Sequence, residues 1–341
     1  MWIYGTELDK TPHIGGIAVS TNTGRRYKYK NIALALAVML LSVLALGRGC
    51  ASEEKTELDK NVPEIFRPVT SHSAPKVEII PFKAEGLEKN FRYLNVRNGE
   101  TVGMGDLLLL NQAYKFDGTP GDLVSCYEYL FDKSGTQIAS ATSTLTRASK
   151  RVLSAFNEMV CDFYQKTGKS TIMLTDLYIE NGDTNKPCFE HESGLALDLR
   201  LYYEAEKTFP EFTGTGEYSW FADNCYKYGF VLRYPADKAV VTGVQEIANH
   251  FRYVGKPHAE IMKKNGLCLE EYLEMLKQYK IDSPYSFESE DGSCWAVYYF
   301  EQSTEPTTNI PIPLDKTDTE YTHSISGDNQ EGYIITVNIP Q

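Results

Sequence analysis

The clearest periodic pattern in the chain lies between Leu145 and Lys166, where apolar residues recur at spacings of three and four. The residues that carry this pattern are Val152, Phe156, Met159, Val160 and Phe163. Such a spacing places them on one face of a helix. Gly168 follows directly, and we expect it to end this helix.

Shorter apolar runs predict strands, and helices are expected between and after them. The expected strands are residues 106–112, 171–178, 194–203, 230–234 and 250–254. A further helix is expected at residues 218–228, and two more after Pro257, with Gly266 between them. Beyond Asp282 the pattern changes, because residues 294–301 and 331–339 alternate like strands around a turn-rich acidic stretch. This predicts a small β appendage over residues 282–341.

The N-terminal region contains an unbroken apolar run from Ile32 to Gly47, preceded by the basic stretch Arg25–Lys30. As a helix it would span about 24 Å, short of a bilayer core of roughly 30 Å. A short membrane anchor at 31–48 and a signal-peptide core are both open, and the long leader favours the anchor. Cys50 also allows a lipoprotein, although the residues before it are a poor cleavage context.

An anchor here implies a single-pass topology. The basic flank favours a cytoplasmic segment at 1–30, so that the rest of the chain lies outside the cell membrane. Residues 52–90 are polar and proline-bearing, which predicts a linker. The main domain would then cover residues 91–281.

The net charge is −12, and a surface this acidic repels nucleic acid, so we expect no such partner. Six of the seven cysteines lie beyond the predicted linker, at positions 126, 161, 188, 225, 268 and 294. Disulfides in an oxidising space and buried free thiols are both open. No CxxC pair occurs, so a cysteine-based zinc cluster is not expected.

Three residues carry the candidate chemistry: His191, Asp198 seven positions later, and His250. Imidazole nitrogen and carboxylate oxygen suit zinc, and a catalytic zinc site needs three protein ligands and an open position. Spacing alone is weak evidence, because a hydrogen-bonded His–Asp pair without metal fits it too.

The sequence around these residues also resembles that of a known family. HESGLALDL, from His191, resembles the H-x-x-G-x-A-x-D motif of VanY-type D-alanyl-D-alanine carboxypeptidases, which are zinc peptidases of the bacterial cell wall. Residues 220–235, 242–255 and 266–273 resemble later segments of that family, in the same order. The resemblance covers roughly residues 100–280. It implies zinc ligands His191, Asp198 and His250, and a compact α+β domain with a central antiparallel sheet.

The chain departs from the family at three places. The family's general base, a Glu three residues before the last His, is replaced by Ile247, and Glu246 is one position earlier. A one-residue shift in a strand reverses the face on which a side chain lies. Phe189 replaces a family Ser, and no Arg follows Thr175 where the family binds a terminal carboxylate. Glu246 is our candidate base; the possible substitutes are Glu190, Glu192, Arg252 and His258.

Two functions therefore stay open. One is an extracytoplasmic zinc carboxypeptidase acting on peptidoglycan stem peptides of the D-Ala-D-Ala type, held at the membrane by the N-terminal anchor. The other is a catalytically degenerate relative, a zinc-containing peptidoglycan-binding or scaffold protein. The matched motifs favour the enzyme, whereas the three departures favour the binding protein.

Overall fold

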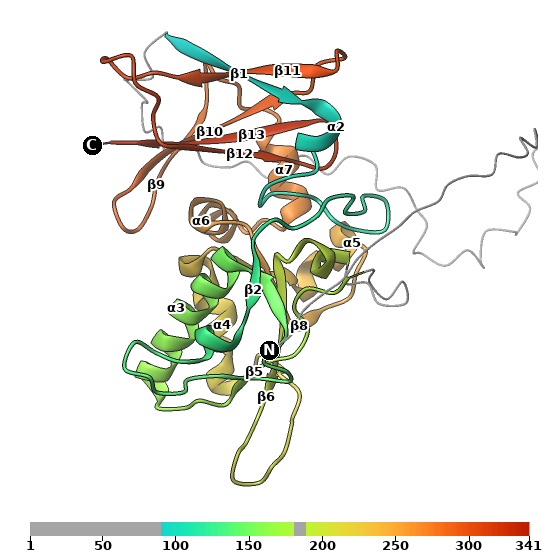
Figure 1. The fold of residues 1–341 in the computed structure, drawn as a ribbon, viewed down its shortest axis with the longest axis vertical. Coiled ribbons are helices and arrows are strands. Elements are labelled where there is room, and N and C mark those ends of the chain that lie inside the picture. Colours follow the sequence, from blue (N-terminus) through green and yellow to red (C-terminus); the bar gives the residue numbers. More distant parts are fainter. Residues whose placement is uncertain (1–89, 181–188, 341) are drawn as a thin grey trace, which may run out of the picture. The chain divides into compact units, whose positions relative to one another are not determined.

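The computed structural model describes residues 90–180 and 189–340, which all belong to one unit spanning residues 72–341 (Figure 1). The predicted cytoplasmic segment 1–30, the anchor 31–48 and the linker 52–90 lie outside the described residues. Within the described ranges, no helix has both the length and the apolar character needed to cross a bilayer.

A five-stranded sheet forms the centre of the region that contains the predicted ligands. Its strands run in the order β3 (Ser140–Ala141), β5 (Ile172–Leu174), β6 (Ala196–Leu201), β8 (Ile247–Tyr253) and β7 (Phe230–Tyr234). The pairs β5–β6, β6–β8 and β7–β8 are antiparallel, and β3–β5 is parallel. The predicted antiparallel sheet is therefore present with one parallel pair at its edge.

Helix α3 (Lys150–Thr167) buries its apolar face against this sheet. Leu197 and Leu199 of β6 and Phe251 of β8 belong to the same buried cluster. The predicted helix thus forms and stops at Gly168, which has a positive φ of 70°. It begins at Lys150 rather than Leu145, because residues 147–149 pair with another strand instead.

The remaining short elements connect the sheet to its surroundings. They are α2 (Asn98–Thr101), β2 (Leu123–Ser125), η2 (Tyr127–Leu130), β4 (Arg147–Ser149), η3 (Phe189–Ser193), η4 (Gly216–Tyr218), α4 (Ser219–Asn224), η5 (Cys225–Tyr228), η6 (Ala236–Lys238), α5 (Ala239–Thr242), α6 (Lys256–Asn265) and α7 (Leu269–Leu276). The two helices predicted after Pro257 are therefore confirmed as α6 and α7, with Gly266 between them. The helix predicted at 218–228 is divided into α4 and η5.

The strand predicted at residues 106–112 is wrong. This segment has no regular secondary structure, although Leu107, Leu108, Leu109 and Leu110 are all buried. Its backbone groups bond to other partners: the carbonyl groups of Asp106 and Leu108 accept from Arg252, and the amide of Leu109 donates to Asp328. An apolar run signals burial, and here burial occurs without strand pairing.

The C-terminal strands form a separate four-stranded sheet in the order β12 (His323–Gly327), β13 (Gly332–Ile339), β10 (Cys294–Glu301) and β9 (Tyr285–Glu288). The predicted strands at 294–301 and 331–339 are confirmed as β10 and β13. A two-stranded sheet of β1 (Phe91–Arg97) and β11 (Thr307–Pro313) shares a buried cluster with it. Residues 91–97 therefore lie with the C-terminal strands; the boundary predicted at residue 282 stays a prediction.

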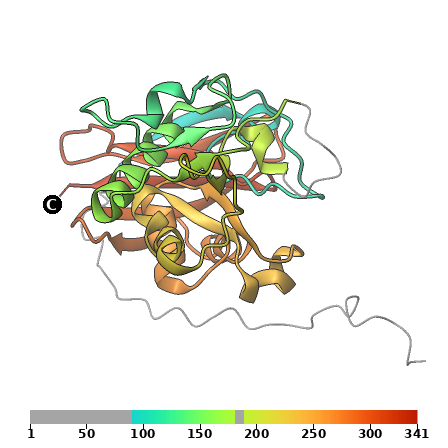
Figure 2. The ribbon, with the colours of Figure 1, turned by 90° about the horizontal axis from the view of Figure 1, so that it is seen from below.

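Helices α6 and α7 pack against the C-terminal sheet, which can be followed from two directions in Figures 1 and 2. Their shared buried cluster includes Ile261, Leu273, Val297 and Ile334. The cysteines at 126, 161, 225, 268 and 294 form no disulfides, and four of them are buried. For these five residues the structure fits the thiol alternative; Cys188 lies outside the described residues.

His258 joins three elements at this junction. Its Nδ1 lies 2.7 Å from the Tyr272 hydroxyl of α7, and its Nε2 lies 2.9 Å from Thr336 Oγ1 of β13. The side chain is buried, and burial lowers its pKa to about 3. His258 is therefore a neutral structural residue rather than a surface group or a substitute catalyst.

We predict that His258 makes the metal-free protein less stable as the pH falls from about 6.5 towards 4.5. In this range the unfolded chain protonates His258 and the folded chain does not, which lowers the unfolding free energy by up to about 1.4 kcal/mol per pH unit. Below about 4.5 the buried carboxylates add to this loss. Urea unfolding at several pH values, with a chelator present, measures the slope.

The variant His258→Gln should flatten this slope. His323→Gln, at the half-buried start of β12, is the matched control and should keep the wild-type slope. An equal slope in His258→Gln and the wild type would contradict the prediction.

Candidate metal centre

Asp198 and His250 face each other across an antiparallel strand pair. Asp198 of β6 is the Cα partner of His250 on β8. Side chains at such directly opposed positions have Cβ atoms about 5 Å apart, close enough to interact. The Asp198 Oδ1 and His250 Nδ1 atoms lie 2.6 Å apart. Sheet register therefore brings together two residues that are far apart in the sequence.

His191 reaches the same point from η3, immediately before β6. The chain turns at Gly194, whose positive φ of 70° suits glycine, and whose amide donates to the carbonyl of His191. A Cβ at Gly194 would lie only 2.8 Å from Leu123 Cδ2. This turn places His191 Nε2 3.4 Å from Asp198 Oδ1. The motif therefore needs glycine at position 194, because both the backbone conformation and the close packing there exclude a side chain.

An irregularity in β8 sets the orientation of His250. Between the pairs Leu232↔Phe251 and Tyr234↔Ile247, β7 advances by two residues and β8 by four. Such a bulge changes the direction of nearby side chains. The Tyr234 ring stacks on the His250 ring, with 5.4 Å between centroids and 22° between planes. Pairing and stacking together fix the imidazole of His250.

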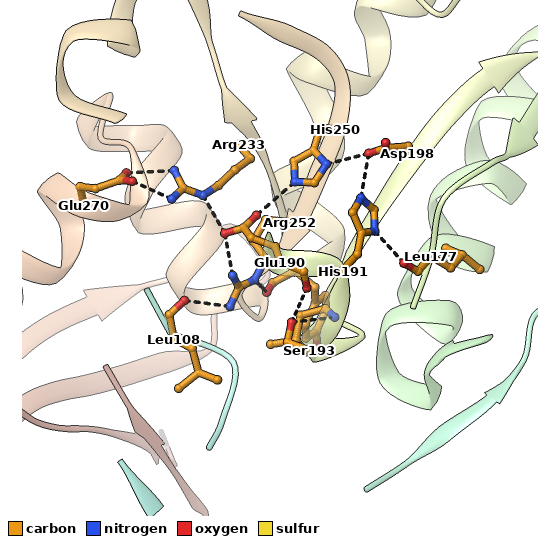
Figure 3. A network of polar contacts seen from close by, with 12 residues as sticks. Leu108, Leu177, Glu190, His191, Ser193, Asp198, Arg233, His250, Arg252 and Glu270 are labelled. Carbon is orange, nitrogen blue, oxygen red and sulfur yellow. Dashed lines mark hydrogen bonds and ion pairs between the residues drawn. The ribbon is translucent and has the colours of Figure 1, made fainter. Parts of the chain in front are cut away.

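The predicted ligands His191, Asp198 and His250 form a group whose ligand atoms all lie within 4.8 Å of one another. The nitrogen of each imidazole that faces away from Asp198 is bonded to an acceptor (Figure 3). His191 Nδ1 donates to the Leu177 carbonyl at 2.7 Å, and His250 Nε2 lies 3.1 Å from Glu190 Oε2. Metal-binding histidines ordinarily have such outer partners, which fix the tautomer and the ring.

One of these distances is that of a zinc site, and the donor set suits the ion. Tetrahedral ligand atoms at zinc lie about 3.3 Å apart, close to the 3.4 Å between His191 and Asp198. The shorter contact of Asp198 with His250 is that of a charge-assisted hydrogen bond. Two imidazole nitrogens and one carboxylate oxygen are also the donor set that zinc accepts in catalytic sites.

Glu190 is fully buried and lies behind His250 in an ionic network (Figure 3). Its Oε1 accepts hydrogen bonds of 2.8 Å from both Arg233 Nε and Arg252 Nη1. Arg233 also forms a bidentate pair with Glu270 of α7, at 2.6 and 2.9 Å. Burial opposes ionisation of Glu190, but the two guanidinium groups outweigh it and hold the Glu190 pKa far below its ordinary value.

The carboxylates raise the basicity of His250 when no metal is bound. Burial disfavours the charged imidazole, but bonding to Asp198 and Glu190 outweighs this effect and raises the His250 pKa to about 9. For Asp198, bonding to the two histidines outweighs burial and lowers its pKa. The site is thus arranged to stabilise positive charge, which a metal ion would supply.

One cavity, of about 360 Å³, opens beside Asp198. Its lining residues are Thr175, Asp176, Asp198, Leu199, Arg200, Glu211, Phe212 and Asn249. His191 and His250 are almost inaccessible, whereas Asp198 is 9% exposed. The side of the site near Asp198 is therefore the one that solvent reaches from this cavity.

The other sequence candidates lie in different surroundings. Glu246 is exposed, immediately before β8, and is not among the residues that line this cavity. Glu192 is half-buried on η3, whereas Glu190 and Arg252 are engaged with each other. Sequence reasoning missed Arg233 and the Leu177 carbonyl. Arg233 lies in the motif-bearing segment 220–235, but its partner Glu190 is 43 positions away.

Comparisons with known proteins agree with this site. A VanY family model, described as D-alanyl-D-alanine carboxypeptidase, matches residues 185–256. A D-alanyl-D-alanine carboxypeptidase of Enterococcus faecium is 33% identical over 253 residues, covering 70% of this chain and 77% of that protein. The bifunctional D-Ala-D-Ala dipeptidase and carboxypeptidase VanXYC of Enterococcus gallinarum is 39% identical over 93 residues, 27% of this chain and 49% of that protein.

A solved structure supports the fold. The D,D-dipeptidase VanXYg, in complex with a D-Ala-D-Ala phosphinate analogue, has a TM-score of 0.58 and 26% identity, covering 73% of this chain and 100% of that chain. These similarities support a peptidase, with a mixed α/β fold. More narrowly, the chain belongs to the VanY family of D-alanyl-D-alanine carboxypeptidases, so the resemblance predicted from the motifs is confirmed.

We predict that Glu190→Gln lowers both stability and metal affinity. Two buried guanidinium groups lose their shared anion, which costs about 3–5 kcal/mol of unfolding free energy. His250 loses its anionic partner, which weakens zinc binding about 10- to 100-fold. Urea unfolding and competition with a chromogenic chelator measure the two effects.

Glu270→Gln is the matched control, because Glu270 pairs with the same Arg233 but does not contact a histidine. It should leave zinc affinity unchanged. Equal zinc affinity in Glu190→Gln and the wild type would show that Glu190 does not support the metal site.

Proposed function

We propose that this protein is a zinc D,D-carboxypeptidase that removes the terminal D-Ala from peptidoglycan stem peptides. The observation that carries the proposal is the buried group of His191, Asp198 and His250, with both outer imidazole nitrogens held by acceptors. This preorganisation is what a three-ligand zinc site requires. Membership of the VanY family supports the choice of substrate.

The chain's own residues have separate roles in this proposal. His191, Asp198 and His250 would hold the ion, and Glu190 would orient His250. When bound, zinc supplies Lewis-acid chemistry, polarising the peptide carbonyl and favouring attack by water. The cavity beside Asp198 gives the substrate access to the site, and its lining carries three carboxylates and one guanidinium group.

Glu246 remains the proposed general base. Glu246 is exposed immediately before β8, four residues before His250. A base must come within about 3 Å of the proton it removes, directly or through one water, and such contacts often tighten only when substrate binds. Asp176 is the second candidate, because it lines the cavity beside Asp198.

We also propose an extracytoplasmic location, with the domain held at the cell membrane by residues 31–48. The support comes from the sequence, namely the apolar run and its basic flank. A peptidase acting on stem peptides of the assembled wall would need to lie on that side of the membrane.

A second candidate function is a zinc-containing protein that binds peptidoglycan without hydrolysing it. The exposed position of Glu246, away from the lining of the cavity, is the observation that favours it. Loss of a general base ordinarily lowers the rate about 10²- to 10⁴-fold. Metal and ligand binding would then persist without turnover.

We predict that the purified full chain binds one zinc ion and releases D-Ala from a muramyl pentapeptide. Metal analysis by mass spectrometry and an assay of free D-Ala measure the two properties. His191→Ala and Asp198→Ala should each abolish bound zinc, because two ligands hold the ion poorly. His323→Ala should retain it, since His323 is no ligand.

Zinc without D-Ala release would favour the binding protein. Unchanged metal content in both His191→Ala and Asp198→Ala would refute the ligand assignment and with it the proposed function.

We predict that Glu246→Gln keeps zinc but lowers kcat at least about a hundredfold, because the amide cannot accept the proton. Asp176→Asn is measured in parallel on the same pentapeptide. If Glu246→Gln is fully active and Asp176→Asn is not, the base is Asp176 and the assignment to Glu246 is wrong.

A further inference from the structure

A carboxypeptidase must distinguish a free terminal carboxylate from an internal peptide bond. The interaction best suited to this task is a guanidinium group, which binds a carboxylate through two parallel charge-assisted hydrogen bonds. Such a group must lie near the metal ligands, because the terminal carboxylate is only a few bonds from the bond that is cleaved.

Two arginines next to the metal site are already engaged. Arg233 and Arg252 are both buried and both donate to Glu190. Arg233 is further paired with Glu270, and Arg252 donates to two main-chain carbonyls. A substrate carboxylate could reach neither without disrupting the network that orients His250.

Arg200, unlike these two buried and paired arginines, is exposed and lines the cavity. It follows Asp198 by two positions on β6, and alternate residues of a strand lie on the same face about 7 Å apart. It is exposed, and it is the one basic side chain among the residues lining the cavity beside Asp198. Within the described ranges, its guanidinium forms no hydrogen bond or ion pair, even with Glu211 across the isolated bridge.

We infer that Arg200 binds the terminal carboxylate of the substrate and thereby makes this site selective for the end of a peptide. This inference rests on the proposed function. Arg200 is two residues farther along β6 than Asp198 and lines the same cavity, so a peptide whose scissile bond lies at the metal site can extend its carboxylate towards it. Arg200 thus supplies from β6 the positive charge that the segment after Thr175 lacks.

The acidic neighbours of Arg200 limit where in the cavity a carboxylate can bind. Asp176 and Glu211 line the same cavity. These carboxylates repel an anion, so Arg200 is the one side chain of this lining whose charge attracts the terminal carboxylate. A chain end that carries no negative charge gains little from Arg200, and an internal peptide bond offers no such charge.

The test uses two peptides, diacetyl-L-Lys-D-Ala-D-Ala and the same tripeptide ending in a carboxamide. Hydrolysis of both by the zinc-loaded full chain gives kcat and KM, and calorimetry on the metal-free full chain gives binding without turnover. The wild type should favour the carboxylate peptide about 10- to 100-fold in both measurements. Arg200→Ala should remove this preference, chiefly through KM, and Arg200→Lys should retain part of it.

Two further arginines control the experiment. Arg92→Ala removes an exposed arginine on β1 that pairs with Glu320, and it should leave the preference unchanged. Arg147→Ala removes an exposed arginine that lies over the Tyr178 ring. If Arg147→Ala abolishes the preference and Arg200→Ala does not, the inference is overturned and Arg147 takes this role.

The outcomes separate this inference from the proposed function. D-Ala release with an unchanged preference in Arg200→Ala would leave the carboxypeptidase standing and overturn the role of Arg200. No hydrolysis, with a binding preference that depends on Arg200, would overturn the enzyme and keep the carboxylate site. No preference in the wild type would overturn the inference directly.

Discussion

The fully buried carboxylate of Glu190 is the interaction on which the metal site and its surroundings depend. One oxygen accepts from Arg233 of β7 and Arg252 of β8, and the other lies against His250. Through the two arginines, the same network reaches Glu270 of α7 and the main chain of residues 106–108. Burying an anion with two cations is costly unless nearly every donor and acceptor is satisfied, as they are here. The cost has a consequence: η3, β7, β8 and α7 can adopt only arrangements that keep these bonds.

This constraint explains the geometry of the three ligands. Asp198 and His250 meet through sheet register, but register alone leaves the imidazole free to rotate. The bond from His250 Nε2 to Glu190 selects one orientation, and stacking on Tyr234 restricts it further. His191 is held separately, by the Leu177 carbonyl and the Gly194 turn. The ligand set is thus fixed by neighbours that do not touch the ion, which lowers the cost of organising the site when metal binds.

Much of this could be predicted from the sequence, and the parts that could not share one physical cause. Local apolar periodicity and the glycines that end helices predict α3, β7, α6 and α7. The three predicted ligands follow from the motif HESGLALDL and from the resemblance of residues 242–255 to the family. By contrast, the pairing of β1 with β11 joins residues more than two hundred positions apart, and nothing local in either segment specifies it. The apolar run at 106–112 predicts a strand where the structure is irregular, because such a run reports burial and not hydrogen bonding.

The same reasoning applies to the buried charges. The sequence offers Glu190 and Arg252 as possible catalytic groups, since charged residues near a motif favour that interpretation. Their partners decide otherwise, because a carboxylate with two guanidinium groups is not available as a base, and a guanidinium bonded to it is not available to a substrate. Which residue a charged side chain pairs with depends on the tertiary structure. In this site the pairing distinguishes charged groups that stabilise the fold from those available to a substrate.

That separation also bears on the departures from the family pattern. The three predicted ligands and their outer partners are all in place, so the fold provides the buried arrangement that a metal site would need. The changed positions, Phe189, Ile247 and the segment after Thr175, concern instead the groups that would handle protons and the substrate's charge. Such groups need only reach the cavity, so they can move to a neighbouring strand without disturbing the network of Glu190. Arg200 meets this condition, since it is on the strand of Asp198, on its face, and outside the buried ion pairs. A metal centre fixed by deep contacts can therefore remain constant while the residues that select its substrate change position around it.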